Sequence, residues 1–174
     1  MHKQKILLSI VAALLVIVGV AAAQATFTLV TGTETIFGVP SQGEVRCQGA
    51  TPTGNPFMPC PPGTNGTVRG AQWIAIDATN DLRLDGINHI AVNANFHADG
   101  TAEAWGTFRI EVTGGGVWEG TYEGKQAADG THSIRATGHG SGGSIEGSQL
   151  LDEESYPAGS PIGSITARIL APGK

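Results

Sequence analysis

Residues 87–139, INHIAVNANFHADGTAEAWGTFRIEVTGGGVWEGTYEGKQAADGTHSIRATGH, decide the fold because their strand register can be deduced. The triplet Ala-Asp-Gly occurs at 98–100 and again at 128–130, each time followed by threonine. Both triplets are typical of three-residue hairpin loops, in which a type I turn ends on a glycine in the left-handed region. Such a loop pairs His97 with Thr101, and the second loop pairs its own flanking residues in the same way.

The strand register of the middle hairpin in this stretch is indicated by the side-chain pairs that it would form. Around the turn at residues 113–115, one register places Arg109 opposite Glu119 and Tyr122 opposite Gly106. Opposite charges, and an aromatic ring over a glycine, are both favoured across strands. The register shifted by two residues would instead oppose Glu119 with another glutamate, so we expect the first.

The three registers combine into a four-stranded sheet with two different faces. One face carries charged rows, the most prominent being His89–Arg109–Glu119–His139. The rows of the other face are Ile90–Phe108–Gly120–Gly138, Val92–Gly106–Tyr122–Ala136 and Asn88–Ile110–Trp118–Gly140. One apolar face indicates a half-buried antiparallel sheet over a single core. Glycines beside aromatic residues favour a strongly curved sheet, so a barrel fits better than a flat sandwich.

Short β-type runs separated by turn signals continue along the rest of the chain. They are Thr26–Phe37, Glu44–Gln48, Val68–Thr79, Leu82–Asp85, Ile87–His97, Thr101–Val112, Gly116–Lys125, Thr131–His139, Ser144–Leu150 and Ile162–Leu170. None of them shows a sustained helical period of apolar residues. The sequence therefore predicts an all-β fold, a closed or nearly closed antiparallel up-and-down β-barrel of about eight strands.

The composition agrees with this fold and argues against several classes of function. Of 174 residues, 26 are glycine and 14% are charged, whereas an average protein has ~7% glycine and ~25% charged residues. Glycine destabilises helix interiors by roughly 1 kcal/mol per residue, which argues against helical bundles. The net charge of −5, with only ten Lys and Arg residues, argues against a nucleic-acid partner.

The N-terminus has the pattern of an export signal. Two lysines precede an apolar run at 6–20, and three alanines follow at 21–23. This pattern predicts a cleaved signal peptide over residues 1–23 and a secreted or extracytoplasmic protein with no membrane contact after cleavage. The alternative is an N-terminal membrane anchor, because residues 6–23 are just long enough to span a bilayer.

Export makes a disulfide the expected state of the two cysteines. Cys47 and Cys60 enclose a segment rich in proline and glycine. Such a pair forms a disulfide in an oxidising compartment, whereas two cysteines with no histidine nearby make a poor zinc site. We expect an N-terminal strand and disulfide loop over 24–66 and a barrel body over 67–174, which together form one domain.

Three glycine- and aromatic-rich motifs give the barrel body a family resemblance. They are WGTFRIE at 105–111, GVWEGTYEG at 116–124 and GHGSGGSIEG at 138–147. These motifs resemble those of exported bacterial β-barrel proteins that are similar to the allene oxide cyclase and dirigent-like barrels. The resemblance covers residues 68–170 and implies an eight-stranded antiparallel barrel. It also implies an alternative function, that of a cyclase or isomerase acting on an apolar substrate inside the barrel.

The aromatic residues of the core face are the candidate ligand-binding residues. Phe108, Trp118 and Tyr122 share that face with glycines, and they either line a cavity for a small apolar ligand or fill a narrow core. The sequence favours a non-enzymatic binding or structural module, with a small apolar ligand as its candidate partner. In the cyclase alternative, Tyr122 or a buried acid would assist the reaction.

The other polar groups are expected to have ordinary surface roles. The row that contains Arg109 is predicted to be a charge ladder on the outer wall. Asp77, Asp81 and Asp85 lack the spacing of a calcium loop, and the acidic segment 152–154 is predicted to be a solvated loop. The sequence therefore predicts no catalytic residue, no metal site and no cofactor.

Overall fold

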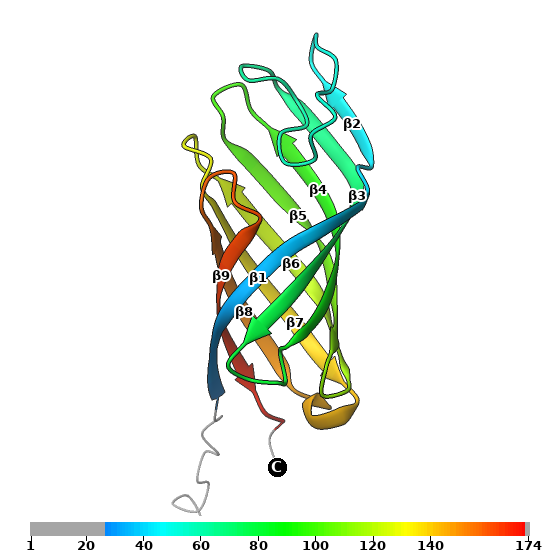
Figure 1. Cartoon of the computed structure of the whole chain (residues 1–174), viewed down its shortest axis with the longest axis vertical. Coiled ribbons are helices and arrows are strands. Elements are labelled where there is room, and N and C mark those ends of the chain that lie inside the picture. The colour runs from blue at the N-terminus through cyan, green and yellow to red at the C-terminus, as the bar shows by residue number, and fades with distance from the viewer. Residues whose placement is uncertain (1–26, 173–174) are drawn as a thin grey trace, which may run out of the picture.

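The computed structural model describes residues 27–172, which fold almost entirely into β-strands (Figure 1). The elements are β1 (Phe27–Ser41), β2 (Glu44–Cys47), β3 (Gly66–Thr79), β4 (Gly86–Phe96), β5 (Ala102–Val112), β6 (Val117–Gln126), β7 (His132–Ser141), the 3₁₀ helix η1 (Gly143–Ile145), β8 (Gln149–Tyr156) and β9 (Ile162–Leu170). The predicted signal peptide at 1–23 lies outside the described residues. Among residues 27–172, no helix is long and apolar enough to cross a membrane.

Eight of the strands close into an antiparallel barrel, which confirms the predicted fold class. Strands β3 to β9 pair in chain order, and β1 closes the ring by pairing with β9 on one edge and β3 on the other. Strand β2 is an additional strand that follows the edge of β3 beyond the end of β1, where Glu44 pairs with Arg69. In Figure 1 it stands at the top of the view, above the ring of strands.

The registers deduced from the sequence for β4 to β7 are confirmed. Arg109 pairs with His89 on one side and with Glu119 on the other. Both Ala-Asp-Gly triplets form the expected loops, in which Gly100 and Gly130 have φ angles of 87° and 86°. Residues with a Cβ rarely adopt this conformation, so the two glycines fix the length of each loop and hence the register.

The predicted strand Leu82–Asp85 is wrong, because these residues form a tight turn. The Asp81 carboxylate accepts hydrogen bonds from the backbone and the guanidinium group of Arg83, each at 3.0 Å. The Leu84 N–H donates to the Asp81 carbonyl at 2.9 Å. Local bonds of this kind satisfy the backbone without a neighbouring strand. Leu84 points into the end of the barrel and is only 1% exposed.

The predicted strand Ser144–Leu150 is also wrong, since most of it is an excursion that precedes β8. Two consecutive glycines at 142–143 with positive φ lead into η1, and the Gly140 N–H donates to the Ser148 carbonyl at 2.9 Å across the excursion. Strand β8 therefore begins at Gln149 and runs through the acidic segment 152–154. That segment is part of the barrel wall, which corrects its prediction as a solvated loop.

The lower half of the barrel, towards the loops at 80–85, 113–116 and 142–148, holds a packed apolar core. Trp118 is fully buried in it, and its Nε1–H donates to the Arg83 carbonyl at 2.7 Å. The other buried members are Val30, Leu84, Phe108, Ile110, Val112, Ala136, Ile145, Leu150, Ile165, Ala167 and Ile169. Leu84 and Ile145 come from the turn and from η1, so the two irregular segments supply side chains that close this end.

Glycines on the inner wall make room for aromatic rings. A Cβ at Gly120 or Gly138 would come within 2.8 Å of the Phe108 ring, and one at Gly163 would come within 2.7 Å of the Tyr156 ring. Real Cβ atoms do not approach ring atoms this closely, so a larger residue would displace the aromatic side chain. The excess of glycine in the composition thus serves the interior of the barrel as well as its turns.

Candidate functional site

The upper half of the barrel, towards the loops at 97–101, 127–131 and 157–161, encloses a cavity of about 130 Å³. Most of its wall is apolar. Strands β3, β4 and β5 contribute Val68, Ala71, Trp73, Ile90, Val92, Ala94, Phe96, Ala102, Ala104 and Phe108 to it. An apolar cavity of ~150 Å³ in another protein binds benzene or xenon. The volume in this barrel therefore suits a ligand of about the size of one aromatic ring.

Two of the three predicted ligand-binding residues line this cavity. Phe108 and Tyr122 belong to its wall, and the Tyr122 hydroxyl donates to the Ala91 carbonyl at 3.2 Å. Burial, and to a lesser extent the charge of Glu34, raises the pKa of the Tyr122 phenol above its ordinary value, so the phenol stays neutral. Trp118 does not line the cavity, because it lies within the lower core.

A group of polar side chains, which we call the interior polar cluster, lies inside the barrel beside the apolar wall. Its members are Glu34, Asp77, Asn88, Asp152, Glu154 and Tyr156. Glu34 is only 2% exposed and accepts two hydrogen bonds, from Asn88 Nδ2 at 2.7 Å and from the Tyr156 hydroxyl. The Tyr156 oxygen also lies 3.0 Å from Glu154 Oε2. All members except Asp77 line the cavity.

The four carboxyl groups of the cluster form two pairs. Glu34 and Asp77 lie opposite each other across β1 and β3, and their side chains are close enough to share a hydrogen bond, as are those of Asp152 and Glu154 on β8. Two carboxyl groups can share a hydrogen bond only when one of them is protonated. Burial first, and the neighbouring acids second, raise the pKa of Asp77 and Glu154 well above the ordinary range. Burial likewise raises the pKa of Asp152 to about 7.

Three oxygen atoms of the cluster have no hydrogen-bond partner in the described part of the chain. They are Asp77 Oδ1, Asn88 Oδ1 and Asp152 Oδ1, although buried polar atoms are nearly always paired. The ion pairs within residues 27–172 join Arg46, Arg83, Arg109 and Arg135 to carboxylates outside the cluster. The cluster is therefore rich in acceptors and receives no salt bridge from a basic side chain of the described residues.

Sequence reasoning places Asn88 on the core face but misses the other five members. Alternation along the strand would identify two of them: Glu34 occupies the same face of β1 as Val30, and Asp77 the same face of β3 as Ala75. Strand β8 offers no such signal, because acidic residues occupy both of its faces. Its inward residues are recognised only once its register with β7 is known, and the excursion before β8 conceals that register.

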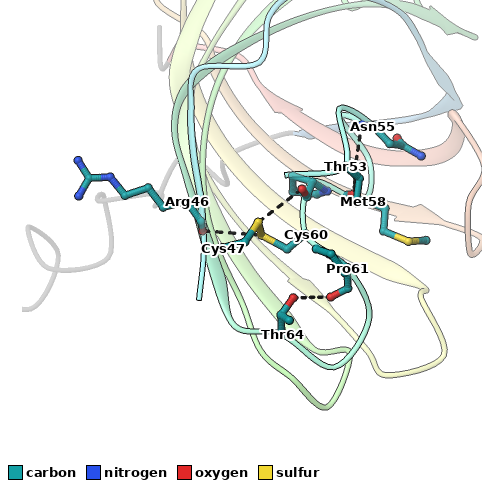
Figure 2. Close-up of a disulfide and its surroundings, with 9 residues drawn as sticks. Arg46, Cys47, Thr53, Asn55, Met58, Cys60, Pro61 and Thr64 are labelled. Atoms are coloured by element: carbon teal, nitrogen blue, oxygen red, sulfur yellow. Dashed lines mark hydrogen bonds between the residues drawn. A yellow bond between two sulfur atoms is a disulfide. The ribbon is translucent and has the colours of Figure 1, made fainter. Parts of the chain in front are cut away.

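The disulfide loop, residues 48–65, connects β2 to β3 and is closed by the predicted bond between Cys47 and Cys60 (Figure 2). The Cα atoms of the two cysteines are 5.6 Å apart. Backbone and hydroxyl groups of Thr53 bond to the other side of the loop, with the Thr53 N–H donating to the Pro59 carbonyl at 2.9 Å. A disulfide is typical of extracytoplasmic proteins, which agrees with the predicted location.

This loop also supplies the outer rim of the cavity. Pro56, Phe57 and Pro59 line it, and the Phe57 ring packs against Trp73 with a centroid distance of 5.3 Å. Phe57 is 43% exposed, so it covers the cavity without being enclosed by the barrel. The loop therefore stands between the apolar wall and the solvent.

The charged row predicted for the outer wall is found there. His89, Glu119 and His139 are exposed, and Arg109 Nε lies 3.4 Å from Glu119 Oε1. These side chains face solvent on the opposite side of the sheet from the cavity. Within residues 27–172, no group of three or more His, Cys, Asp or Glu side chains is placed to hold a metal ion.

The cavity and the interior polar cluster together form the candidate functional site. No protein-family model matches the sequence, and no curated protein or solved structure matches it significantly. The site combines an apolar volume, a covering loop and a set of buried acceptors, which together suit a small ligand with one polar end.

Proposed function

We propose that the barrel binds a small, largely apolar ligand in its upper cavity without transforming it. The observation that carries this proposal is the difference in filling along one barrel. Protein interiors are normally packed to a density of about 0.75, and the lower half is filled with buried side chains such as Trp118, Ile145 and Leu150. The upper half uses alanine and valine at inward positions and leaves about 130 Å³ open. Small barrels commonly hold one small ligand in such a space.

Entry to the cavity is supported by the structure of its rim. The disulfide loop consists mainly of exposed residues, although Pro59 and Cys60 are buried, and over the cavity its Phe57 ring packs on Trp73. Segments with few buried apolar contacts open at low free energy without unfolding the rest of a domain. The loop can therefore admit a ligand while the strands stay paired.

Toluene is a suitable probe because it is apolar, uncharged and close to the cavity in size. We expect it to bind with a dissociation constant on the order of 1 mM, as a ligand of few atoms does. Methyl resonances of the wall alanines, such as Ala94 and Ala104, should shift on titration. The variant Ala104→Leu fills part of the cavity and should weaken binding at least fivefold.

The matched control is Ala91→Leu, which places the same extra atoms on the outer wall of the barrel. Ala91 lies on β4 next to Val92, but its side chain points away from the cavity. This variant should bind toluene as the wild type does. Absence of toluene binding by the folded wild-type protein, or equal binding by both variants, would show that the upper cavity is not a ligand site.

A second candidate function, that of a cyclase or isomerase, is favoured by one specific observation. Glu154 lines the cavity, and burial raises its pKa, which favours the protonated form that could donate a proton to a bound apolar substrate. The resemblance of the wall motifs to allene oxide cyclase and dirigent-like barrels supports the same idea. Chiral analysis of the cyclised product formed from an allene oxide tests it. An enantiomeric excess that Glu154→Gln abolishes would favour catalysis, and a racemic product would exclude this reaction.

A further inference from the structure

We propose that the polar end of the ligand is a protonated amine, held by the interior polar cluster while the apolar body of the ligand lies in the cavity. This inference rests on the proposed ligand-binding function and adds the chemical class of the ligand. Its two independent observations are the unpaired buried oxygen atoms and the absence of a salt bridge to the cluster from the described residues.

The first observation is a shortage of hydrogen-bond donors. Apart from protonated carboxyl groups, the donors of the cluster are the Asn88 amide and the Tyr156 hydroxyl. The hydroxyl and one N–H of the amide are used on Glu34. The carbonyl oxygen of Asn88 remains unpaired although that residue is only 5% exposed, and one oxygen of Asp152, which also lines the cavity, is unpaired as well. An ammonium group has three N–H donors and no acceptor, so it would supply what these oxygens lack.

The second observation concerns charge. The basic side chains on the cavity wall are Lys125 and His132, which come from the ends of β6 and β7 that border the loop at 127–131. Lys125 is exposed, and burial lowers the pKa of His132, which favours its neutral form. Neither side chain forms a salt bridge with the cluster, so a positive charge there has to come with the ligand. A carboxylate ligand would meet repulsion at the same place.

The apolar wall favours an organic cation over a metal ion as the ligand of the cluster. Val92, Ala104 and Phe108 line the same cavity as the cluster. A metal ion would occupy the oxygens but leave this apolar volume empty, whereas an amine attached to one ring or a short alkyl chain fills both. We therefore assign an apolar primary amine rather than a divalent cation.

Binding of an ammonium group is coupled to proton release. An ammonium group that binds between the carboxyl groups of Asp152 and Glu154 should displace a proton held there, because burial raises the pKa of both groups. The titratable groups that face the cluster are Glu34 from β1, Asp77 from β3, Asp85 after β3, Tyr122 from β6, His132 from β7, and Asp152, Glu154 and Tyr156 from β8. Because burial raises the pKa of Asp152 to about 7, affinity for an amine should rise as the pH increases from 6 to 8.

The test compares probes of one shape and different charge at pH 7.5: toluene, benzyl alcohol, benzylamine and benzoate, each titrated into the oxidised full-length protein and followed by NMR. We expect benzylamine to bind at least tenfold more tightly than toluene and benzoate to bind more weakly than toluene. Calorimetry at pH 6, in two buffers of different ionisation enthalpy, should show release of about one proton per benzylamine bound, because Asp152 is mostly protonated at that pH.

The variant Asp152→Asn should lose most of the preference for benzylamine while it keeps its affinity for toluene. Glu119→Gln, on the outer wall, should keep both affinities. Toluene binding by each variant also shows that the variant is folded and retains the cavity. Asn88→Leu provides a second variant, with the same expected loss, in which no carboxyl group is changed.

The possible failures are distinguishable. If toluene binds and benzylamine binds no more tightly, the amine assignment is overturned and the proposed function stands. If no probe binds, the proposed function itself fails and the assignment fails with it. If Ca²⁺ alone displaces benzylamine, or shifts the cluster resonances when benzylamine does not, the cluster is a cation site of another kind and the amine assignment is wrong.

Discussion

The two halves of the barrel are formed by the same strands but are filled in different ways. The lower half contains Trp118, Ile145 and Leu150, each at most 1% exposed, and its buried indole N–H is hydrogen-bonded. The upper half mixes alanines and valines with aromatic residues around an open volume, beside buried oxygens that have no partner among residues 27–172. We propose that the two halves have different roles, in which the packed half supplies stability and the upper half binds the ligand.

Two tryptophans provide the strongest test of this comparison, one in each half. Trp118→Ala should lower the free energy of unfolding by about 4 kcal/mol, because it removes a fully buried ring and leaves a large void. Trp73→Ala should lower it by only about 1 to 2 kcal/mol, because Trp73 is half-buried and already borders a cavity. Urea denaturation measures both values. Equal losses would mean that the two halves contribute alike to stability.

Removal of the disulfide is expected to cause the next largest loss of stability. The variant Cys47→Ser/Cys60→Ser removes the bond between two cysteines that are 13 positions apart in the sequence. For a loop of this length, the chain-entropy model gives a loss of about 3 kcal/mol in the free energy of unfolding. Hydrogen exchange should show faster exchange at residues 48–65, with the strands of the lower half protected as before. A melting temperature equal to that of the oxidised wild type would contradict a stabilising role for this bond.

The pH dependence of stability is expected to come mainly from the hollow half. Because burial raises the pKa of Asp152 in the folded state to about 7, the folded protein binds a proton there more tightly than the unfolded chain does. Stability should therefore fall as the pH rises from 5 to 8, by on the order of 2 kcal/mol from this group. Asp152→Asn should flatten the profile, as measured by thermal unfolding across that range. An unchanged slope in the variant would place the titrating group elsewhere.

A substitution on the outer wall is expected to change the free energy of unfolding least. Glu119→Gln removes one partner of an exposed ion pair with Arg109, and such pairs contribute at most about 0.5 kcal/mol. The unfolding free energy and the affinity for toluene should both stay within error of the wild type. A loss above 1 kcal/mol would indicate that the charged row is more than a solvated surface.

Local features allowed part of this structure to be predicted from the sequence. The registers of β4 to β7 follow from the Ala-Asp-Gly loops and from the Arg109–Glu119 pair, because each of these acts between residues close in the chain. The core face of that sheet was predicted for the same reason. Strand β8 was misplaced because the glycines at 140–143 introduce an irregular excursion, which no periodic pattern reveals.

The cavity could be predicted only in part, for a different physical reason. Whether a core-facing aromatic fills the barrel or lines a hollow depends on side chains that arrive from distant segments. Trp118 is enclosed because Leu84 and Ile145 close the lower end, and these two residues come from segments that the sequence predicts as strands. The pairing of Glu34 with Asp77 depends on the closure of β1 against β3, which joins residues 43 positions apart.

Binding of xenon tests most directly whether the upper half of the barrel alone is hollow and accepts an apolar guest. Crystals of the oxidised protein would be pressurised with xenon, which occupies apolar cavities of this size, and its sites located by anomalous scattering. We expect xenon in contact with Val92, Ala104 and Phe108 and none between Trp118 and Ile145. An empty upper cavity, or xenon in the lower core, would contradict this expectation.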